Sequence, residues 1–333
     1  MAEREAAAGA IYDIGYQHYD GKRLGRAGAV RALYVHGLRT IFGIGRGGKA
    51  KIPPIALIAF MVIPAVIQAF LAALGNGQIQ VFTHDGYFRT TVWIFGLFCA
   101  FQTPELVSGD QQHRVLALYF SRALLRPDYV LARVGAMATA LFVVALLPHM
   151  VMLLGEYFAA EHVVDAIKKS LPLIPRILGD ALLISVLLAT ISITVSAIIK
   201  RRPFATAAII GLFLLSSAFA TTLVMSRPDK MRYMVLASPM LVGAGLTTWA
   251  FDTVTVHPPR DTTLGVPLPP LPPTADSATK AARRIEMRRR FSRRRNGPVE
   301  AADLPGAIYL AMTAGLILVS AGVLTLRYRS IET

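Results

Sequence analysis

The sequence predicts an all-α integral membrane protein with six transmembrane helices, and its composition and apolar patterning lead to that fold class. Hydrophobic residues make up 54% of the 333 residues and charged residues only 17%, with a mean hydropathy of +0.51. A soluble fold of this size could not cover so much apolar side chain with so few charges. The apolar residues also fall into long runs, and roughly 20 helical residues cross a hydrocarbon core of ~30 Å. The bilayer is therefore predicted to be part of the solvent.

The first 51 residues are predicted to form a cytosolic N-terminal region. They carry nine Lys or Arg residues against four Asp or Glu residues, a bias that holds this end of the chain inside. They contain no short apolar core with a cleavage site, so we expect no cleaved signal peptide. Residues 27–44 place apolar residues at helical spacing among arginines, which is typical of an amphipathic elbow helix in the inner interface.

Six apolar runs follow that are long enough to span the bilayer. They cover residues 52–74, 90–107, 129–154, 177–199, 204–224 and 304–326. A seventh run, residues 234–251, is shorter and contains a Ser-Pro pair and two glycines. We predict a re-entrant or interfacial element there, since irregular backbone at membrane depth needs protein or water to satisfy it.

This pattern divides the chain into four regions. The predicted regions are residues 1–51, residues 52–225 with five spans and a coupling loop at 108–128, residues 226–303 with the re-entrant segment and a Pro-rich and Arg-rich insertion, and residues 304–333 with the last span and a cytosolic tail.

The charges between the runs support an inside N-terminus. With six spans, the loop at 108–128, the Lys-Arg-Arg turn at 200–202 and the tail all fall in the cytosol, as the positive-inside rule requires. Residues 226–303 disagree, because six spans place their thirteen Lys and Arg residues outside, nine of them between Lys280 and Arg295. A full crossing by residues 234–251 would move this basic segment inside, and that alternative stays open.

The insertion itself has two compositional parts. Residues 257–274 are proline-rich and predict an extended spacer, with a ligand for a proline-recognising domain as the alternative. Residues 277–295 predict either a basic helix lying against acidic headgroups or a solvated charge run. The net charge of +15 sits in blocks between apolar runs. We therefore expect membrane lipid, and no nucleic acid, as the partner of these charges.

No motif in the sequence predicts chemistry on this chain. Gly43 to Lys49 have the spacing of a phosphate-binding loop, but Ala50 stands where that loop needs Ser or Thr and the chain enters the membrane two residues later. We interpret the segment as a glycine-rich hinge and expect no ATP hydrolysis by this chain. The seven histidines are scattered and Cys99 lies in an apolar run, where a buried structural thiol is expected. We predict no catalytic, cofactor or metal site and no enzymatic activity.

Polar residues inside the apolar runs are few. Glu105, Arg133 and Asp180 lie near predicted span ends, where we expect snorkelling or interfacial water to satisfy them. Without an internal ion relay, proton- or sodium-driven transport is disfavoured. Hydroxyl groups of the fourth and fifth runs could line a polar pathway, but helix packing is the favoured interpretation. The candidates are Thr190, Ser192, Thr194, Ser196, Ser216 and Thr221.

The segment from Pro104 to Arg133 carries a resemblance. It contains an acidic residue before Gly109-Asp-Gln-Gln-His-Arg114, then Ser121-Arg122 and the third run, and in this it resembles the ABC type-2 transporter permease family. Ser238-Pro239 after the fifth run is similar too, and Ile11 to Gly25 resemble the cytosolic lead-in of a bacterial exporter subgroup. The resemblance covers most of the chain except the insertion near residues 252–303.

The resemblance implies a function and a set of contacts. Residues 109–126 would be a coupling helix seated on a separate ABC ATPase subunit, which would hold the ATP and magnesium. The contact residues carried over by position are Asp110, Gln111, Gln112, His113, Arg114 and Tyr119. The chain would then be a permease subunit of an exporter in the cell membrane, paired with itself or a paralogous permease, and would move an amphiphilic or lipid-like substrate.

Two interpretations compete with the exporter. The protein could be a non-transporting membrane scaffold that docks a cytosolic partner through the same loop, or residues 109–126 could be an ordinary interfacial connector. A membrane-embedded enzyme is a third option, and the missing catalytic constellation argues against it.

Overall fold

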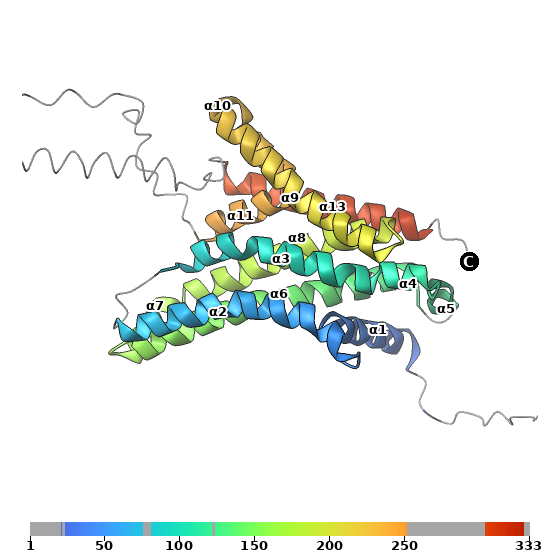
Figure 1. Ribbon diagram of the computed structural model, residues 1–333, viewed down its shortest axis with the longest axis horizontal. Coiled ribbons are helices and arrows are strands. Elements are labelled where there is room, and N and C mark those ends of the chain that lie inside the picture. Colours follow the sequence, from blue (N-terminus) through green and yellow to red (C-terminus); the bar gives the residue numbers. More distant parts are fainter. Residues whose placement is uncertain (1–20, 22–23, 76–80, 122–123, 252–303, 330–333) are drawn as a thin grey trace, which may run out of the picture.

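The computed structural model describes residue 21 and residues 24–75, 81–121, 124–251 and 304–329, and its regular elements are helical. Six long helices form a bundle (Figure 1). They are α2 (Ile52–Leu74), α3 (His84–Leu106), α6 (Arg126–Ala159), α8 (Leu173–Ile198), α9 (Arg202–Ser226) and α13 (Gly306–Arg329). The shorter elements are α1 (Gly25–Ile41), η1 (Gly48–Lys51), α4 (Ser108–Gln112), α5 (Leu116–Phe120), α7 (Val163–Ser170), α10 (Pro228–Met231), η2 (Arg232–Ala237) and α11 (Pro239–Ala250).

Among the described residues, five helices are long and apolar enough to cross a membrane. They are α2 together with η1, α6, α8, α9 and α13. This set indicates an all-α, multi-pass membrane protein. The sixth predicted span corresponds to α3, which is 23 residues long but less apolar, because its first turns contain His84, Asp85 and Arg89. It begins six residues before the predicted run, where Thr83 Oγ1 accepts a hydrogen bond from the Gly86 amide.

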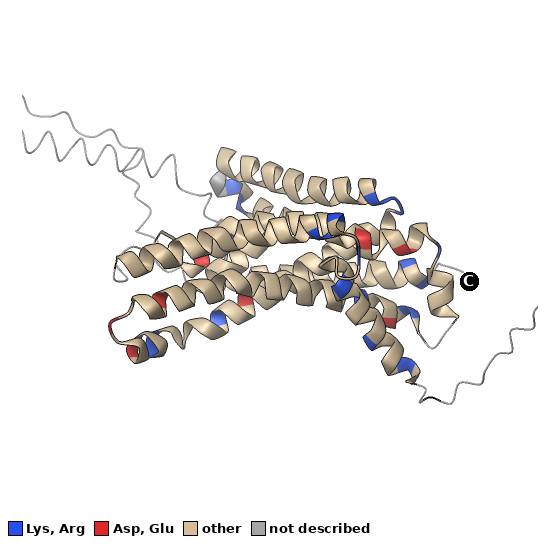
Figure 2. Ribbon diagram, turned by 60° about the horizontal axis from the view of Figure 1, so that its bottom comes forward, with Lys and Arg blue, Asp and Glu red and all other residues tan. Residues whose placement is uncertain are grey.

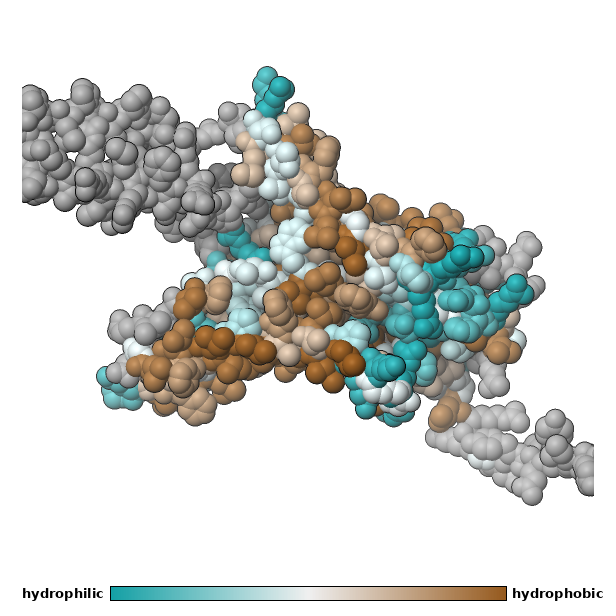
Figure 3. All heavy atoms as spheres, viewed as in Figure 1, coloured by the Kyte–Doolittle hydropathy of each residue, from teal (hydrophilic) through white to brown (hydrophobic). Residues whose placement is uncertain are grey.

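Burial separates central helices from peripheral ones. The apolar window of α8 is 72% buried inside the bundle, against 22% for α2 and for α13. Apolar side chains on α2, such as Phe60 and Phe70, are more than half exposed, and brown surface covers this helix in Figure 3. A helix in this position needs an apolar solvent on its outer side. In Figure 2, much of the charge lies towards the ends of the bundle.

Small residues let several helices approach closely. A Cβ built on Gly155 of α6 would lie 2.3 Å from the Cβ of Ala69 on α2, and one on Gly37 of α1 would lie 2.8 Å from the Cβ of Ala136 on α6. Backbones this close gain van der Waals contact that larger residues would prevent. A helix is present where the elbow helix was predicted, and Arg26 fastens it to α6 through two 2.7 Å bonds to the Asp128 carboxylate.

The segment before the last long helix turns back within the bundle. Its helix α11 has 12 residues, about 18 Å of rise, which is too short to cross the hydrocarbon core alone. Ser238, which precedes α11, lies with its Oγ 2.6 Å from the Oγ of Ser217, well inside α9. At the other end, Arg176 near the start of α8 donates to the Phe251 carbonyl oxygen (3.2 Å).

The last helix begins at the same end of the bundle. Gly306 packs so closely on Trp249 that a Cβ on it would meet the indole at 1.8 Å. Phe251 and Gly306 therefore both lie at the bundle end where α8 begins, and α7 precedes α8 there. The predicted proline-rich and basic segments between them lie outside the described residues, as does nearly all of the N-terminal lead-in at residues 11–25.

Candidate functional site

The polar end of the bundle is built around the connection between α3 and α6. We predicted one coupling helix over residues 109–126, and this is wrong: the segment contains two five-residue helices, α4 and α5, joined by a turn. Arg114 in that turn has φ of 54°, a left-handed conformation that is uncommon for residues other than glycine. The break turns α5 away from α4 and gives the connection a compact, folded shape (Figure 1).

Asp110 of α4 anchors this connection to α6. Its Oδ2 accepts hydrogen bonds from Arg133 Nη2 (2.5 Å) and from the Tyr129 hydroxyl (2.8 Å). The Arg133 side chain is only 1% exposed, and its guanidinium carbon lies 5.4 Å from the centre of the Tyr129 ring. A buried cation of this kind is tolerated only when it is paired and hydrogen-bonded. The pair therefore fixes α4 against the start of α6.

Two further side chains fasten α4 to the end of α8. Ser108 Oγ lies 2.8 Å from the Ile199 carbonyl oxygen and 3.2 Å from Ser196 Oγ. Gln111 Nε2 donates to the Ala197 carbonyl oxygen at 2.9 Å. These carbonyl groups end a helix and have no partner within it, so the two side chains also cap α8. The connection is thereby tied to α6 and α8 at once.

The six predicted contact residues divide into two groups. Asp110 and Gln111 point into the bundle as anchors, and Tyr119 is half-buried with its ring 6.1 Å from that of Tyr129. Burial raises the pKa of the Tyr119 hydroxyl above its ordinary value. The outward group consists of Gln112, His113 and Arg114, all exposed.

Sequence reasoning missed Leu118, which is 67% exposed on α5. A single exposed leucine is common on protein surfaces, and Leu118 is of interest here because it lies in the same connection as the exposed Gln112, His113 and Arg114. Its position in the apolar stretch Leu116–Phe120 concealed it, because nothing in the sequence distinguished the outward residue from the inward Leu116.

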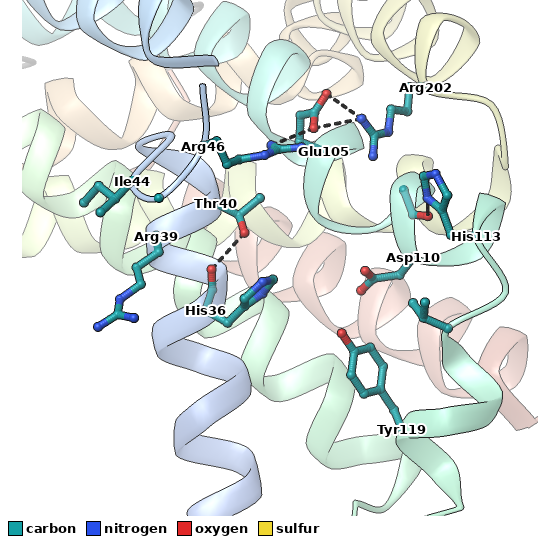
Figure 4. Close-up of a pocket in the computed structure, with 13 residues that line it drawn as sticks. His36, Arg39, Thr40, Ile44, Arg46, Glu105, Asp110, His113, Tyr119 and Arg202 are labelled. Atoms are coloured by element: carbon teal, nitrogen blue, oxygen red, sulfur yellow. Dashed lines mark hydrogen bonds and ion pairs between the residues drawn. The ribbon is translucent and has the colours of Figure 1, made fainter. Parts of the chain in front are cut away.

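A three-residue ion-pair cluster lies next to α4. Glu105 near the end of α3 accepts from Arg46 Nη1 (2.8 Å) and from Arg202 Nη1 (3.0 Å to each carboxylate oxygen). The bridge joins the turn after α1, the end of α3 and the start of α9 (Figure 4). All three side chains are about one-third exposed, so solvent screens the attraction and the cluster positions the elements more than it stabilises them.

A hollow of about 560 Å³ lies between this ion-pair cluster and α4–α5. Its lining includes His36, Asp110, His113 and Tyr119, and Figure 4 shows how these side chains surround it. Burial, together with the positive charge of Arg133, lowers the pKa of His36 below its ordinary value. The hollow is open to solvent, and its lining combines charged side chains with apolar surface.

The expectation that snorkelling or interfacial water satisfies Arg133 and Asp180 is wrong, because both side chains are only 1% exposed within the bundle. Neither carboxylate oxygen of Asp180 has a well-formed hydrogen bond within the described part of the chain, and the Thr247 hydroxyl of α11 lies close enough to interact with it. Glu105 is paired in the ion-pair cluster instead. A further buried pair joins α3 and α6, where His84 Nδ1 lies 3.0 Å from His149 Nδ1.

Five of the six hydroxyl groups considered for a polar pathway form hydrogen bonds to helix backbone or to a neighbouring helix. Thr194 donates to the Thr190 carbonyl oxygen (2.7 Å), and Ser192 accepts from Thr103 of α3 (3.1 Å). Ser196 lies against Ser108, and Ser216 donates to the Leu212 carbonyl oxygen. Thr221 of α9 is half-buried. The bonds of Ser192 and Ser196 join α8 to α3 and α4, whereas those of Thr194 and Ser216 stay within their own helices.

The glycine-rich segment Gly43 to Lys49 lies between helices α1 and α2, and its last residues form η1. Gly43 and Gly45 have φ of 66° and 82°, so they are required by the backbone of a tight turn. A phosphate-binding loop of the nucleotide type follows a strand, and here a helix precedes the segment. The interpretation as a hinge between α1 and α2 agrees with this arrangement.

Fold and site together define an all-helical, multi-pass membrane protein with a folded polar connection anchored at one end of its bundle. No protein-family model matches the chain, and no curated protein matches it.

Proposed function

We propose that this protein is the membrane-spanning permease subunit of an ATP-binding-cassette exporter, in which α4 and α5 dock on a separate ATPase subunit. A pair of permease subunits, either two copies or two paralogues, would enclose the pathway. The N-terminus and the α4–α5 connection would face the cytosol, and the substrate would be amphiphilic or lipid-like, in keeping with the apolar helices.

The observation that carries the proposal is that the α4–α5 connection is fixed to the bundle on one side and exposed on the other. Its inner side is fixed to α6 and α8 by Asp110, Ser108 and Gln111, while Gln112, Arg114 and Leu118 are exposed. A partner that moved the outer side would move α6 and α8 with it, because buried polar bonds of this kind resist deformation. In an exporter, the closing of the ATPase subunits on ATP must drive a change between two transport states of the permease. A rigid connection between the two proteins transmits that movement.

The arrangement of the long helices supports a six-span topology. Helix α3 would be the sixth crossing: it lies among α2, α8 and α9, and fifteen of its residues are buried. Packing against other helices lets a span carry more polar residues than lipid would allow. With α11 re-entrant, the connection from α11 to α13 would lie outside.

Purification from the native membrane in mild detergent tests the proposal directly. We expect an ATPase subunit to copurify in stoichiometric amount, with vanadate-sensitive turnover that rises when this chain is present. An ATPase that binds without stimulation would support a scaffold and contradict the exporter. A chain that purifies alone and without ATPase activity in several detergents would contradict both.

The docking surface can be tested by charge reversal of an outward residue. Arg114→Glu should weaken binding of the ATPase subunit or uncouple its turnover from transport, while membrane insertion is retained. Lys168→Glu on α7 is the matched control, because Lys168 is also exposed (71%) but lies at the opposite end of the bundle. Equal coupling in both variants would mean that α4–α5 is an ordinary connector.

A further inference from the structure

A second hollow adjoins the ion-pair cluster on the side facing α2 and α9. Its volume is about 840 Å³, and three cations, Arg46, Lys49 and Arg202, line it together with one carboxylate, Glu105. We call it the interfacial basic pocket. Glu105 is already engaged by both arginines, whereas Lys49 makes no ion pair within the described residues. The pocket is therefore left with an excess of positive charge.

The other walls of the interfacial basic pocket combine apolar side chains with the polar side chains of Thr40, Gln102 and Thr206. Pro53 of α2, Phe101 of α3 and Pro203 of α9 line it, and Phe101 is 45% exposed. These residues lie in the first turns of α2 and α9 and near the end of α3. Cations and apolar walls thus meet at the depth where the apolar helices begin, which is the depth of lipid headgroups when those helices cross a bilayer.

Two glycines of the pocket suggest how closely a ligand approaches. Unlike Gly43 and Gly45, Gly47 and Gly48 do not have positive φ, and a Cβ built on either meets no atom within 4 Å. Neither backbone strain nor crowding within the chain therefore calls for glycine at these two positions. Both line the pocket, so a side chain there would occupy its space. The two glycines therefore leave room for a ligand to lie directly on the backbone.

We propose that the interfacial basic pocket binds the phosphate headgroup of an anionic membrane lipid. Lys49 would be the main contact to the phosphate, and Arg46 and Arg202 would add positive charge beside it. Their remaining N–H groups are donors suited to phosphate oxygens. Phe101 and Pro203 would border the first carbons of the acyl chains. The inference requires that the long helices span a membrane, but it does not require an ATPase partner.

Lipid retention by the purified, full-length protein tests this proposal. Delipidated protein in detergent is titrated with phosphatidylglycerol or with phosphatidylcholine, and bound lipids are counted by native mass spectrometry. We expect one phosphatidylglycerol to bind with clear preference, and Lys49→Gln to weaken its affinity about fivefold, the effect of one basic residue near an anionic headgroup. Gly48→Trp should block the same binding event by filling the pocket.

Lys51→Gln is the matched control, since Lys51 is exposed two residues further on and does not line the pocket. If Lys49→Gln and Lys51→Gln lowered the affinity for phosphatidylglycerol equally, the proposal would be overturned, because the lipid would then be attracted by the general positive charge of the surface. Equal binding of phosphatidylcholine, or unchanged binding in Gly48→Trp, would also overturn it. Inorganic phosphate at millimolar concentration is the final competitor. If it displaced bound phosphatidylglycerol as completely as unlabelled phosphatidylglycerol does, free phosphate would be the ligand and the lipid assignment would be overturned.

Discussion

Arg133 and Asp110 decide how the polar end of the bundle is held together. Arg133 is buried against Tyr129, and its Nη2 donates to the Asp110 carboxylate; its Nε and Nη1 have no hydrogen-bond partner among the described residues. A buried charge whose donors are only partly used depends strongly on the partner that it has. The Arg133–Asp110 pair joins the α4–α5 connection to α6, so both the stability of this bundle end and the position of the connection depend on it.

Removing Asp110 from this pair should be costly. We expect Asp110→Leu to lower the free energy of unfolding by about 3 kcal/mol, because it leaves the Arg133 charge buried without its partner. The double variant Asp110→Leu with Arg133→Met should be more stable than Asp110→Leu alone, since no unpaired charge remains. Thermal unfolding in detergent measures both. A double variant less stable than Asp110→Leu would contradict the pairing.

For Asp180, in contrast to Asp110, we expect that removing the charge does not destabilise the fold. Its carboxylate is buried in α8 and has no well-formed hydrogen bond among the described residues, although the Thr247 hydroxyl interacts with it. Asp180→Asn should therefore leave the unfolding temperature unchanged or raise it, because the amide has almost the same size and carries no charge to bury. A clear fall in that temperature would contradict this interpretation and would mean that the carboxylate holds a proton or cation that stabilises the fold.

At the scale of elements, close helix contacts set the shape of the bundle. Gly155 brings α6 against α2, and Gly245 of α11 lies against the ring of Tyr309 on α13, where a Cβ would meet ring atoms at 2.3–2.6 Å. Atoms that close must move apart, and a whole helix moves when the obstacle is backbone.

Gly155→Ala should separate α2 from α6. Its new Cβ would lie 2.5 Å from the Ala69 Cα, which cannot rotate away, so we expect a loss of about 1–3 kcal/mol in unfolding free energy. Gly315→Ala on α13 is the control, because a Cβ there meets no atom within 4 Å and alanine favours the helix. Equal unfolding temperatures of the two variants would show that the α2–α6 contact is looser than described.

For the whole molecule, the orientation in the membrane follows from which bundle ends are accessible. Cys99 is fully buried, so the natural thiol should give little background in labelling with a membrane-impermeant maleimide. In intact cells, we expect Lys168→Cys and Arg227→Cys to be labelled and Gln112→Cys to be labelled only after permeabilisation. Labelling of Gln112→Cys in intact cells would reverse the proposed orientation. Protection of Arg227→Cys would contradict the crossing of α8 or α9.

The sequence by itself predicted the long helices closely. The run at residues 52–74 coincides with α2, and the runs at 177–199 and 204–224 differ from α8 and α9 by at most four residues at either end. Prediction succeeds here because a membrane span needs about 20 consecutive apolar residues, and that requirement is visible along the chain. Cys99 was expected to be buried for the same reason, and this is confirmed.

The tertiary structure alone decided how the polar residues are used. Asp110, Gln111 and Arg114 are neighbours in a polar segment, and only the folded arrangement turns the first two inward to α6 and α8 and leaves the third outside. Glu105 likewise meets Arg46 and Arg202, residues 59 and 97 positions away. The sequence does not indicate which residue a charged side chain will pair with, because the pairing depends on how distant helices are rotated and packed. Apolar length therefore determined the helices, and packing between them determined the site.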